Sequence, residues 1–272
     1  MRTSRDEIQT STTLIEIGSA THVGQVRGNN EDNYRVVPAL NLFVLSDGIG
    51  GQASGEVASA MAVETIVAHC LEFSTDRPID KQEEPQSAIS ERTNELVKAT
   101  YLANRAIHET SAHDPQFQGM GATVVAAWID GLRLSLVHVG DSRAYLLRGG
   151  LLESLTSDHT LVAEQVRSGL LTLEQAKTNP LRRMLIRSLG IREEVEIDIR
   201  EHELRGGDVL LLCSDGLTGM VSESEITDIL LQSGDAQSAA DRLVTSANEH
   251  GGEDNVTVIL VRIGVSAGQS GL

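Results

Sequence analysis

The chain twice contains a short apolar segment that ends in the same three residues, Ser-Asp-Gly. The first runs over residues 42–48 and continues into Ile49-Gly50-Gly51, and the second covers residues 209–216. A strand end fixes the direction of a side chain, and glycines let a ligand or another main chain come close. Two such carboxylates, Asp47 and Asp215, indicate that remote segments of a sheet-rich fold converge on one cation. A tight turn at each Asp-Gly is the simpler alternative for either segment alone.

The composition bounds the class of protein. A chain of 272 residues forms one large domain or two small ones and buries a sizeable core. Aromatic residues make up 3% of it, so the core consists of Leu, Val, Ile and Ala. A formal net charge of −17 argues against a nucleic-acid-binding surface, which requires basic residues.

Two cysteines, Cys70 and Cys213, lie in apolar segments, and their spacing suits neither a zinc site nor a redox pair. They are expected to be buried free thiols, which fits a reducing compartment. The first residues are polar and lack an apolar stretch of signal-peptide length, and no segment is expected to be long and apolar enough to cross a membrane. These features predict a cytoplasmic protein that binds no nucleic acid and no membrane.

Apolar periodicity predicts the order of helices and strands. Helices are expected over residues 55–73, 87–113, 222–231 and 236–249, and short helices within 157–189. Strands are expected over residues 13–20, 34–37, 41–45, 123–129, 132–139, 144–147, 151–155, 195–199, 208–213 and 256–263. Asp130-Gly131 is a hairpin signal, and the strands from 123 to 155 follow one another as in an antiparallel meander.

Strands first, then two long helices, then further strands is the order of an α+β protein and not of a βαβ array. We therefore predict two antiparallel β-sheets packed as a central sandwich, flanked by α-helices on both sides. No internal repeat or linker is visible, so residues 13–264 are expected to form a single domain. Residues 1–12 and 265–272 are expected to be flexible tails.

Acidic residues recur at strand ends and tight turns along the chain. Aspartate is a poor strand former, and turn chemistry explains one or two such cases but not five beside glycines and apolar strands. Carboxylates are ligands for magnesium and manganese, the absence of histidine from these motifs disfavours zinc, and no calcium-loop pattern is present. The candidate ligands are Asp32 with its neighbour Glu31, Asp47, Asp141, Asp215 and Asp254.

Six motifs in order, spanning roughly residues 18 to 263, resemble those of the metal-dependent protein serine/threonine phosphatases, the PPM or type 2C family, in its bacterial branch. Each motif is weak alone, but six in register are a specific signal. They are Arg27 with Glu31-Asp32, Ser46-Asp47-Gly48-Ile49-Gly50-Gly51, Gly119-Met120-Gly121-Ala122-Thr123, Val139-Gly140-Asp141-Ser142-Arg143, Cys213-Ser214-Asp215-Gly216-Leu217 and Glu253-Asp254-Asn255-Val256.

The resemblance implies a role for each matching residue. It implies that Asp47 bridges two Mn²⁺ or Mg²⁺ ions and that Gly48 offers its main-chain carbonyl. Asp215 and Asp254 would hold the first ion. Asp32 and, less directly, Glu31 would serve the second ion. Asp141 would hold a third, looser ion together with Asp215, and Arg27 would contact the substrate phosphate.

The mechanism that this implies is hydrolysis without a covalent enzyme intermediate. Two cations a few ångströms apart lower the pKa of a shared water, and the bridging hydroxide attacks phosphorus in line. Arg27 orients and neutralises the phosphate oxygens; its alternative is an exposed ion pair with Glu31. Ile49 replaces the histidine common in eukaryotic members and leaves the general acid open. A metal-bound water near Asp141, His159 and His138 are the alternatives, although a lone histidine is more often structural.

The resemblance also implies phosphorylated proteins as partners, a bacterial serine/threonine kinase and its substrates among them, and the chain is expected to be a monomer. Residues 157–189 correspond to the variable flap of bacterial relatives, whose arginines either meet an acidic phosphoprotein or form a solvated face. An inert metal-stiffened binding module and a phosphatase of small phosphate esters are the competing functions. Intact Asp47, Asp215 and Asp254 argue against the inert module.

Overall fold

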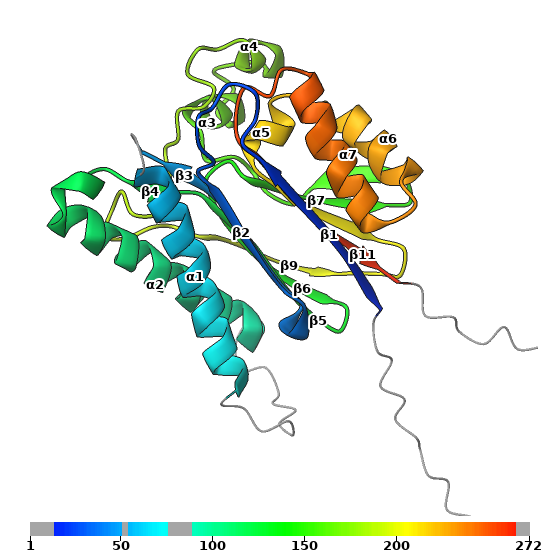
Figure 1. The fold of residues 1–272 in the computed structure, drawn as a ribbon, viewed down its shortest axis with the longest axis horizontal. Helices are drawn as coiled ribbons and strands as arrows, with labels where there is room; N and C mark the ends of the chain where they lie inside the picture. Colours follow the sequence, from blue (N-terminus) through cyan, green and yellow to red (C-terminus); the bar gives the residue numbers. More distant parts are fainter. Residues whose placement is uncertain (1–13, 51–53, 76–88, 265–272) are drawn as a thin grey trace, which may run out of the picture.

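Two antiparallel β-sheets form the centre of the molecule (Figure 1). The computed structural model describes residues 14–50, 54–75 and 89–264, so the predicted tails at 1–12 and 265–272 lie outside the described residues. The first sheet contains, in spatial order, β1 (Ile15–His22), β11 (Val256–Ile263), β10 (Val209–Cys213), β7 (Arg143–Arg148) and β8 (Leu151–Ser154). The second contains β2 (Asp32–Val37), β3 (Leu42–Ile49), β5 (Val124–Asp130), β6 (Arg133–Val139) and β9 (Asp198–Glu203), with β4 (Gly121–Ala122) paired to β3.

The central strands are apolar on both faces because both faces are buried. In β3, Phe43 and Leu45 belong to the core between the two sheets, whereas Leu42 and Val44 belong to the core under the helices. Alternate residues of a strand point to opposite faces, so a strand covered on both sides reads as a continuous apolar run. The same division separates the even from the odd residues of β10. Of these two strands, β3 carries Asp47 and β10 leads into Asp215.

Helices cover the outer face of each sheet, as Figure 1 shows. On the second sheet lie α1 (Ser54–Thr75) and α2 (Glu91–His113), and on the first lie α5 (Asp215–Thr218), α6 (Glu223–Gln232) and α7 (Ala236–Glu249). The flap holds α3 (Leu161–Arg167) and α4 (Leu173–Lys177), and two 3₁₀ turns, η1 (Pro38–Leu40) and η2 (Pro115–Phe117), complete the described elements. The predicted α+β sandwich with flanking helices is confirmed.

The predicted meander from residue 123 to 155 is wrong. The β5–β6 hairpin lies in the second sheet, and the β7–β8 hairpin lies in the first. The chain changes sheets at Gly140, whose φ of +113° is a conformation that favours glycine. A Cβ atom there would lie 2.6 Å from the side chain of Thr123. The crossing places Asp141 between the two sheets at their common end.

Three predicted elements differ from the structure by three or more residues. The strand expected over residues 41–45 continues to Ile49 in β3, so Asp47 lies inside the strand and pairs with Asp32. The helix expected from about residue 87 begins at Glu91, because Ser90 is extended and its side chain accepts from the main-chain N–H of Thr93 as an N-cap. The strand expected over residues 195–199 is β9, three residues later. The apolar Val195 and Ile197 pack in the core beneath the helices instead of defining the strand.

The expectation that no segment could span a membrane by length and composition is wrong for α1. This helix is long and apolar enough to pass that test, which core helices also pass. Its inner residues Ala58, Ala62 and Ile66 are fully buried, and the helix packs against β3 and α2. The apolar character of α1 is therefore explained by its packing against β3 on one side and α2 on another.

Candidate active site

Asp32 and Asp47 face each other across the first pair of strands in the second sheet. The β2–β3 register pairs them directly, which brings two like charges onto neighbouring positions. Asp32 is buried, and its Oδ2 atom accepts a hydrogen bond of 2.8 Å from the Ser214 hydroxyl. Its Oδ1 atom is buried without a hydrogen-bond partner among the described residues. An acceptor oxygen in this setting is available to a cation.

Asp215 and Asp254 reach the same place from the first sheet. Asp215 opens the short helix α5 directly after β10, and Asp254 stands two residues before β11. The main-chain N–H of Ser214 donates to Thr257 O at 3.0 Å, and the N–H of Thr257 donates to the Ser214 hydroxyl at 3.0 Å. Ser214 therefore fixes the end of β10 to β11 and, through Asp32, to the second sheet.

Asp141 enters from the loop that joins the two sheets. A chain of short hydrogen bonds fixes this region: the N–H of Asp47 donates to Thr123 Oγ1 at 2.9 Å, and that oxygen lies 2.7 Å from the hydroxyl of Ser142. The N–H of Thr123 returns a bond of 2.8 Å to the Asp47 carbonyl. The main chains that carry Asp47 and Asp141 are thereby held in a fixed relation.

The pKa values of these carboxyl groups are shifted in the direction expected for crowded, buried acids. Burial raises the pKa of Asp32 to about 7 and that of Asp141 to about 8, and nearby carboxylates, Asp215 in both cases, add to each shift. Burial also raises the pKa of Asp47 well above its usual range, with further contributions from its four acidic neighbours, and raises that of Asp215. Divalent cations supply the charge that such a cluster lacks.

Gly48 and Glu31 lie beside this cluster. A Cβ atom on Gly48 would overlap the main-chain carbonyl of Gly55 and crowd that of Glu31, so only glycine fits there. The main-chain carbonyl of Glu31 accepts a hydrogen bond of 3.1 Å from the N–H of Gly48. Its own carboxylate lies beside Gly55 at the start of α1, and burial raises its pKa. Glu31 is thus near the centre but less directly aimed at it than Asp32.

Two arginines neutralise Asp254, and the sequence indicated only one of them. Arg27 donates to Asp254 Oδ2 at 2.9 Å, so its partner is Asp254 and not Glu31. Arg183 donates to the same oxygen at 2.7 Å, and its Nε atom lies 3.4 Å from Asp215 Oδ2. Nothing in the run Leu181-Arg182-Arg183-Met184 distinguishes Arg183 from its neighbour. Its place at the centre depends on how the flap folds back.

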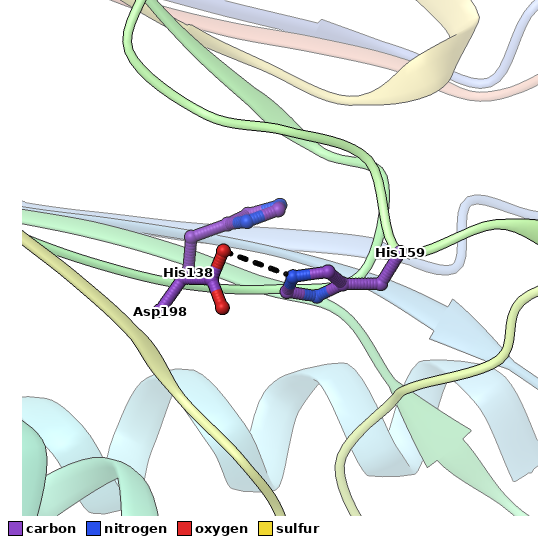
Figure 2. Close-up of side chains that lie close together, drawn as sticks. All are labelled: His138, His159 and Asp198. Carbon is purple, nitrogen blue, oxygen red and sulfur yellow. Dashed lines mark ion pairs between the residues drawn. The ribbon is translucent and has the colours of Figure 1, made fainter. Parts of the chain in front are cut away.

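The two histidines considered as proton donors lie side by side, with His159 at the start of the flap and His138 in β6. His159 is buried, its Nδ1 atom accepts from the N–H of Gly140 at 3.0 Å, and its Nε2 atom lies 3.2 Å from Asp198 Oδ2 (Figure 2). His138 is buried beside it, with ring centroids 4.7 Å apart. Both ring nitrogens of His159 are therefore engaged with Gly140 and Asp198.

Two sheets that bring five aspartates to one end of a sandwich offer the oxygen ligands that divalent-cation-dependent hydrolases use. The sequence model of the protein phosphatase 2C family matches residues 21–253. The chain therefore belongs to the protein phosphatase 2C family, and it is a serine/threonine protein phosphatase.

Known members of this family are similar to the chain over most of its length. The serine/threonine phosphatase Stp of Listeria monocytogenes is 37% identical over 246 residues, which are 89% of this chain and 93% of the relative. The crystal structure of the Mycobacterium tuberculosis serine/threonine phosphatase PstP/Ppp superposes with a TM-score of 0.80 at 37% identity, over 93% of this chain and all of that one. The catalytic domain of PstP in complex with two manganese ions gives a TM-score of 0.77, again at 37% identity, 93% of this chain and 100% of that one.

Proposed function

We propose that this phosphatase hydrolyses phosphoserine and phosphothreonine in proteins at a binuclear Mn²⁺ or Mg²⁺ centre. The observation that carries the proposal is the convergence of Asp32, Asp47, Asp215 and Asp254, which lie in or next to β2, β3, β10 and β11. Among the described residues, one buried oxygen of Asp32 has no hydrogen-bond partner. The all-oxygen donor set of carboxylates and the Gly48 carbonyl fits hard divalent cations. The two manganese ions in the relative PstP support the same choice of metal.

Each acidic residue takes one role in this proposal. Asp47 would bridge the ions with help from the Gly48 carbonyl, Asp215 and Asp254 would hold one of them, and Asp32 with Glu31 the other. Asp141 would hold a third ion together with Asp215.

When bound, the two ions supply Lewis-acid charge and activate a water for in-line attack on phosphorus. Arg27 is half exposed, so its guanidinium can turn from Asp254 to donate to two phosphate oxygens and orient the ester. Ile49 follows Gly48 and carries no proton to donate.

The biological setting belongs to the same proposal. The enzyme opposes a bacterial serine/threonine kinase and acts on that kinase and its substrates, as a cytoplasmic monomer. Residues 13–264 form its single catalytic domain. The net charge of −17 supports a protein partner over a nucleic acid.

Phosphate release from different substrates tests this function. Phosphoserine and phosphothreonine peptides should be hydrolysed with Mn²⁺ or Mg²⁺, and a chelator should stop the reaction. A sugar phosphate, offered at the same concentration, should react far more slowly. Faster hydrolysis of the sugar phosphate would favour the small-ester phosphatase, and no turnover of any substrate would favour the inert binding module.

Metal removal should also lower thermal stability. Without cations, the clustered carboxylates lose the charge that balances them, and a ligand at 100 times its Kd contributes about 2.7 kcal/mol. For a chain of this size, we expect the melting temperature to fall by roughly 5–10 °C when excess Mn²⁺ is replaced by a chelator. Differential scanning calorimetry measures the difference. Identical melting curves in the two buffers would argue against a shared site.

A further inference from the structure

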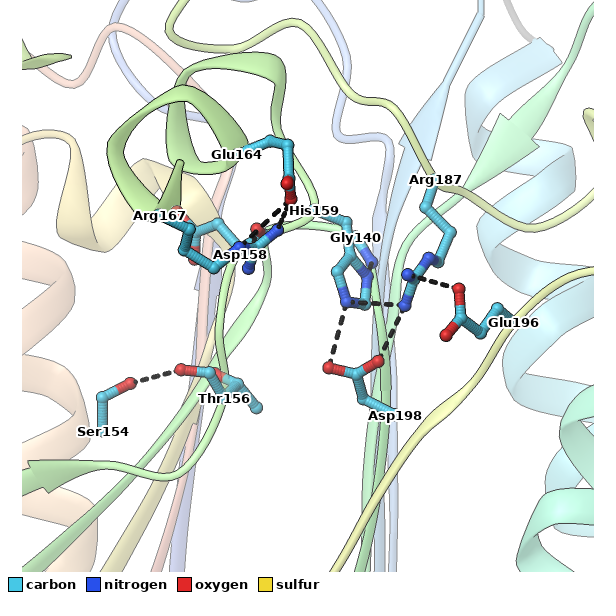
Figure 3. A network of polar contacts seen from close by, with 10 residues as sticks. All are labelled: Gly140, Ser154, Thr156, Asp158, His159, Glu164, Arg167, Arg187, Glu196 and Asp198. Atoms are coloured by element: carbon cyan, nitrogen blue, oxygen red, sulfur yellow. Dashed lines mark hydrogen bonds and ion pairs between the residues drawn. The ribbon is translucent and has the colours of Figure 1, made fainter. Parts of the chain in front are cut away.

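One histidine clamps the residue that precedes Asp141. The main-chain N–H of His159 donates to the Gly140 carbonyl at 2.8 Å, and its ring Nδ1 accepts from the N–H of Gly140 at 3.0 Å. Gly140 is thus held through both of its main-chain polar groups by a single residue, which lies beside it in Figure 3. The clamp fixes the peptide from which Asp141 projects.

The neighbouring residue holds the other side of the same loop. Arg143 follows Asp141 by two positions and forms a two-fold ion pair with Asp158, with both N···O distances at 2.7 Å. Asp158 and His159 are consecutive, so one dipeptide contacts Gly140 before Asp141 and Arg143 after it. A paired, planar contact of this kind fixes direction as well as distance.

The contact with Gly140 selects one of the two neutral forms of the His159 ring. The N–H of Gly140 can only donate, so Nδ1 must carry a lone pair and the ring proton must lie on Nε2. Nε2–H then faces Asp198 Oδ2 at 3.2 Å. The opposite form would leave the Gly140 N–H facing another N–H. NH1 of Arg187 lies 3.0 Å from Nε2 but does not need it as an acceptor, because Arg187 donates to Asp198 and Glu196. The N–H of Gly140, by contrast, has Nδ1 of His159 as its acceptor.

The same geometry disfavours a metal ion at this cluster. One ligand atom from each of His138, His159 and Asp198 lies within 4.8 Å of the others, which is close enough to hold a cation. The Arg187 guanidinium already lies there, 2.7 Å from Asp198 Oδ1 and 3.0 Å from His159 Nε2. A metal on Nε2 would also move the ring proton to Nδ1, against the N–H of Gly140.

Both ends of the flap meet at this histidine. The carbonyl of His159 accepts from the N–H of Ile186 at 2.9 Å, next to Arg187, and Thr160 pairs with Leu185 in a β-bridge. Arg187 then connects the flap to Asp198 at the start of β9. A displacement of either end of the flap would therefore be transmitted through His159 to the peptide of Gly140.

We infer that His159 is a positioning residue that holds Gly140 in place, sets the direction of Asp141, and couples the flap to the weakest of the cation sites. The inference rests on the proposed function for the assignment of Asp141 as a metal ligand. Outer contacts that orient a metal ligand change metal affinity by about 10–100-fold when they are removed. The Gly140 contact is of this kind, one residue away from the ligand.

Two variants of His159 separate positioning from simple packing. His159→Asn places an amide oxygen where Nδ1 lies and keeps an acceptor for Gly140, whereas His159→Gln is larger but places its amide at the position of Nε2. Calorimetric titration with Mn²⁺ should show the weakest binding step retained in His159→Asn and weakened about 10–100-fold in His159→Gln, with the tighter steps unchanged in both. Equal loss in both variants, or a better-preserved site in His159→Gln, would overturn the inference.

The ring form of His159 is measured independently of any metal. Long-range ¹H–¹⁵N spectra of the chelated wild-type protein should show the proton of His159 on Nε2, and the signal is assigned by its absence in His159→Asn. A proton on Nδ1 would contradict the clamp. Failure of the wild-type protein to bind Mn²⁺ would instead contradict the proposed function and leave the spectrum to decide the clamp.

Discussion

Asp47→Asn should reduce phosphate release by at least about 100-fold, because even outer contacts to a metal ligand cost up to that factor and Asp47 is assigned to the ions directly. The substitution preserves size and hydrogen-bonding reach but removes the negative charge at the residue that lies among the other four aspartates. Asp215→Asn should have an effect of the same order. Activity is measured on a phosphothreonine peptide with saturating Mn²⁺.

The same substitution should make the chelated protein more stable. Burial and four acidic neighbours disfavour an ionised Asp47, whereas in the unfolded chain this group ionises freely at neutral pH. Asparagine does not carry this penalty, so the melting temperature in chelator should rise by about 3 °C for each 1 kcal/mol gained. Asp228→Asn, an exposed carboxylate on α6, is the matched control and should change neither quantity. A variant that loses activity and also melts lower in chelator would indicate damage to the fold.

The sequence was sufficient to predict those elements and site residues whose structure depends on neighbouring residues. Turn residues and apolar runs place Asp47 near the end of β3 and Asp215 just after β10, and the antiparallel register then brings Asp32 opposite Asp47. The strand β11 and the helix α7 match their predicted limits because each is bounded by turn residues on both sides. These elements depend on a few neighbouring residues, so a single sequence is enough to predict them.

The sequence was not sufficient where distant segments decide. The change of sheet at Gly140 depends on the packing of Thr123 against it, and a meander has the same local pattern. Arg183 reaches Asp254 from 71 positions away only because the flap folds over the site. His159 and Asp198 come from different elements, so no spacing in the sequence indicates that they meet.

His138 should make the protein lose stability in acid. This histidine is 1% exposed, and neither ring nitrogen has a hydrogen-bond partner among the described residues. Burial lowers its pKa from 6.5 to about 4, the neighbouring His159 lowers it further, and Asp158 and Asp198 act in the opposite direction. In the unfolded chain His138 therefore takes up a proton near pH 6.5, whereas in the folded chain it is protonated only near pH 4.

The neutral His138 ring costs no stability above pH 6.5, its pKa in the unfolded chain. The free energy of unfolding then falls as the pH drops from 6.5 toward about 4, the pKa of His138 in the folded chain. From the two pKa values, the loss due to His138 is about 2 kcal/mol at about pH 5 and about 3 kcal/mol at about pH 4. Urea unfolding of the chelated protein at several pH values should show this loss in the wild type and in His113→Gln, an exposed control. His138→Gln, which has no titrating ring, should show a shallower decline by that amount. Parallel curves for all three proteins would mean that His138 takes up its proton in the folded state as easily as in the unfolded chain.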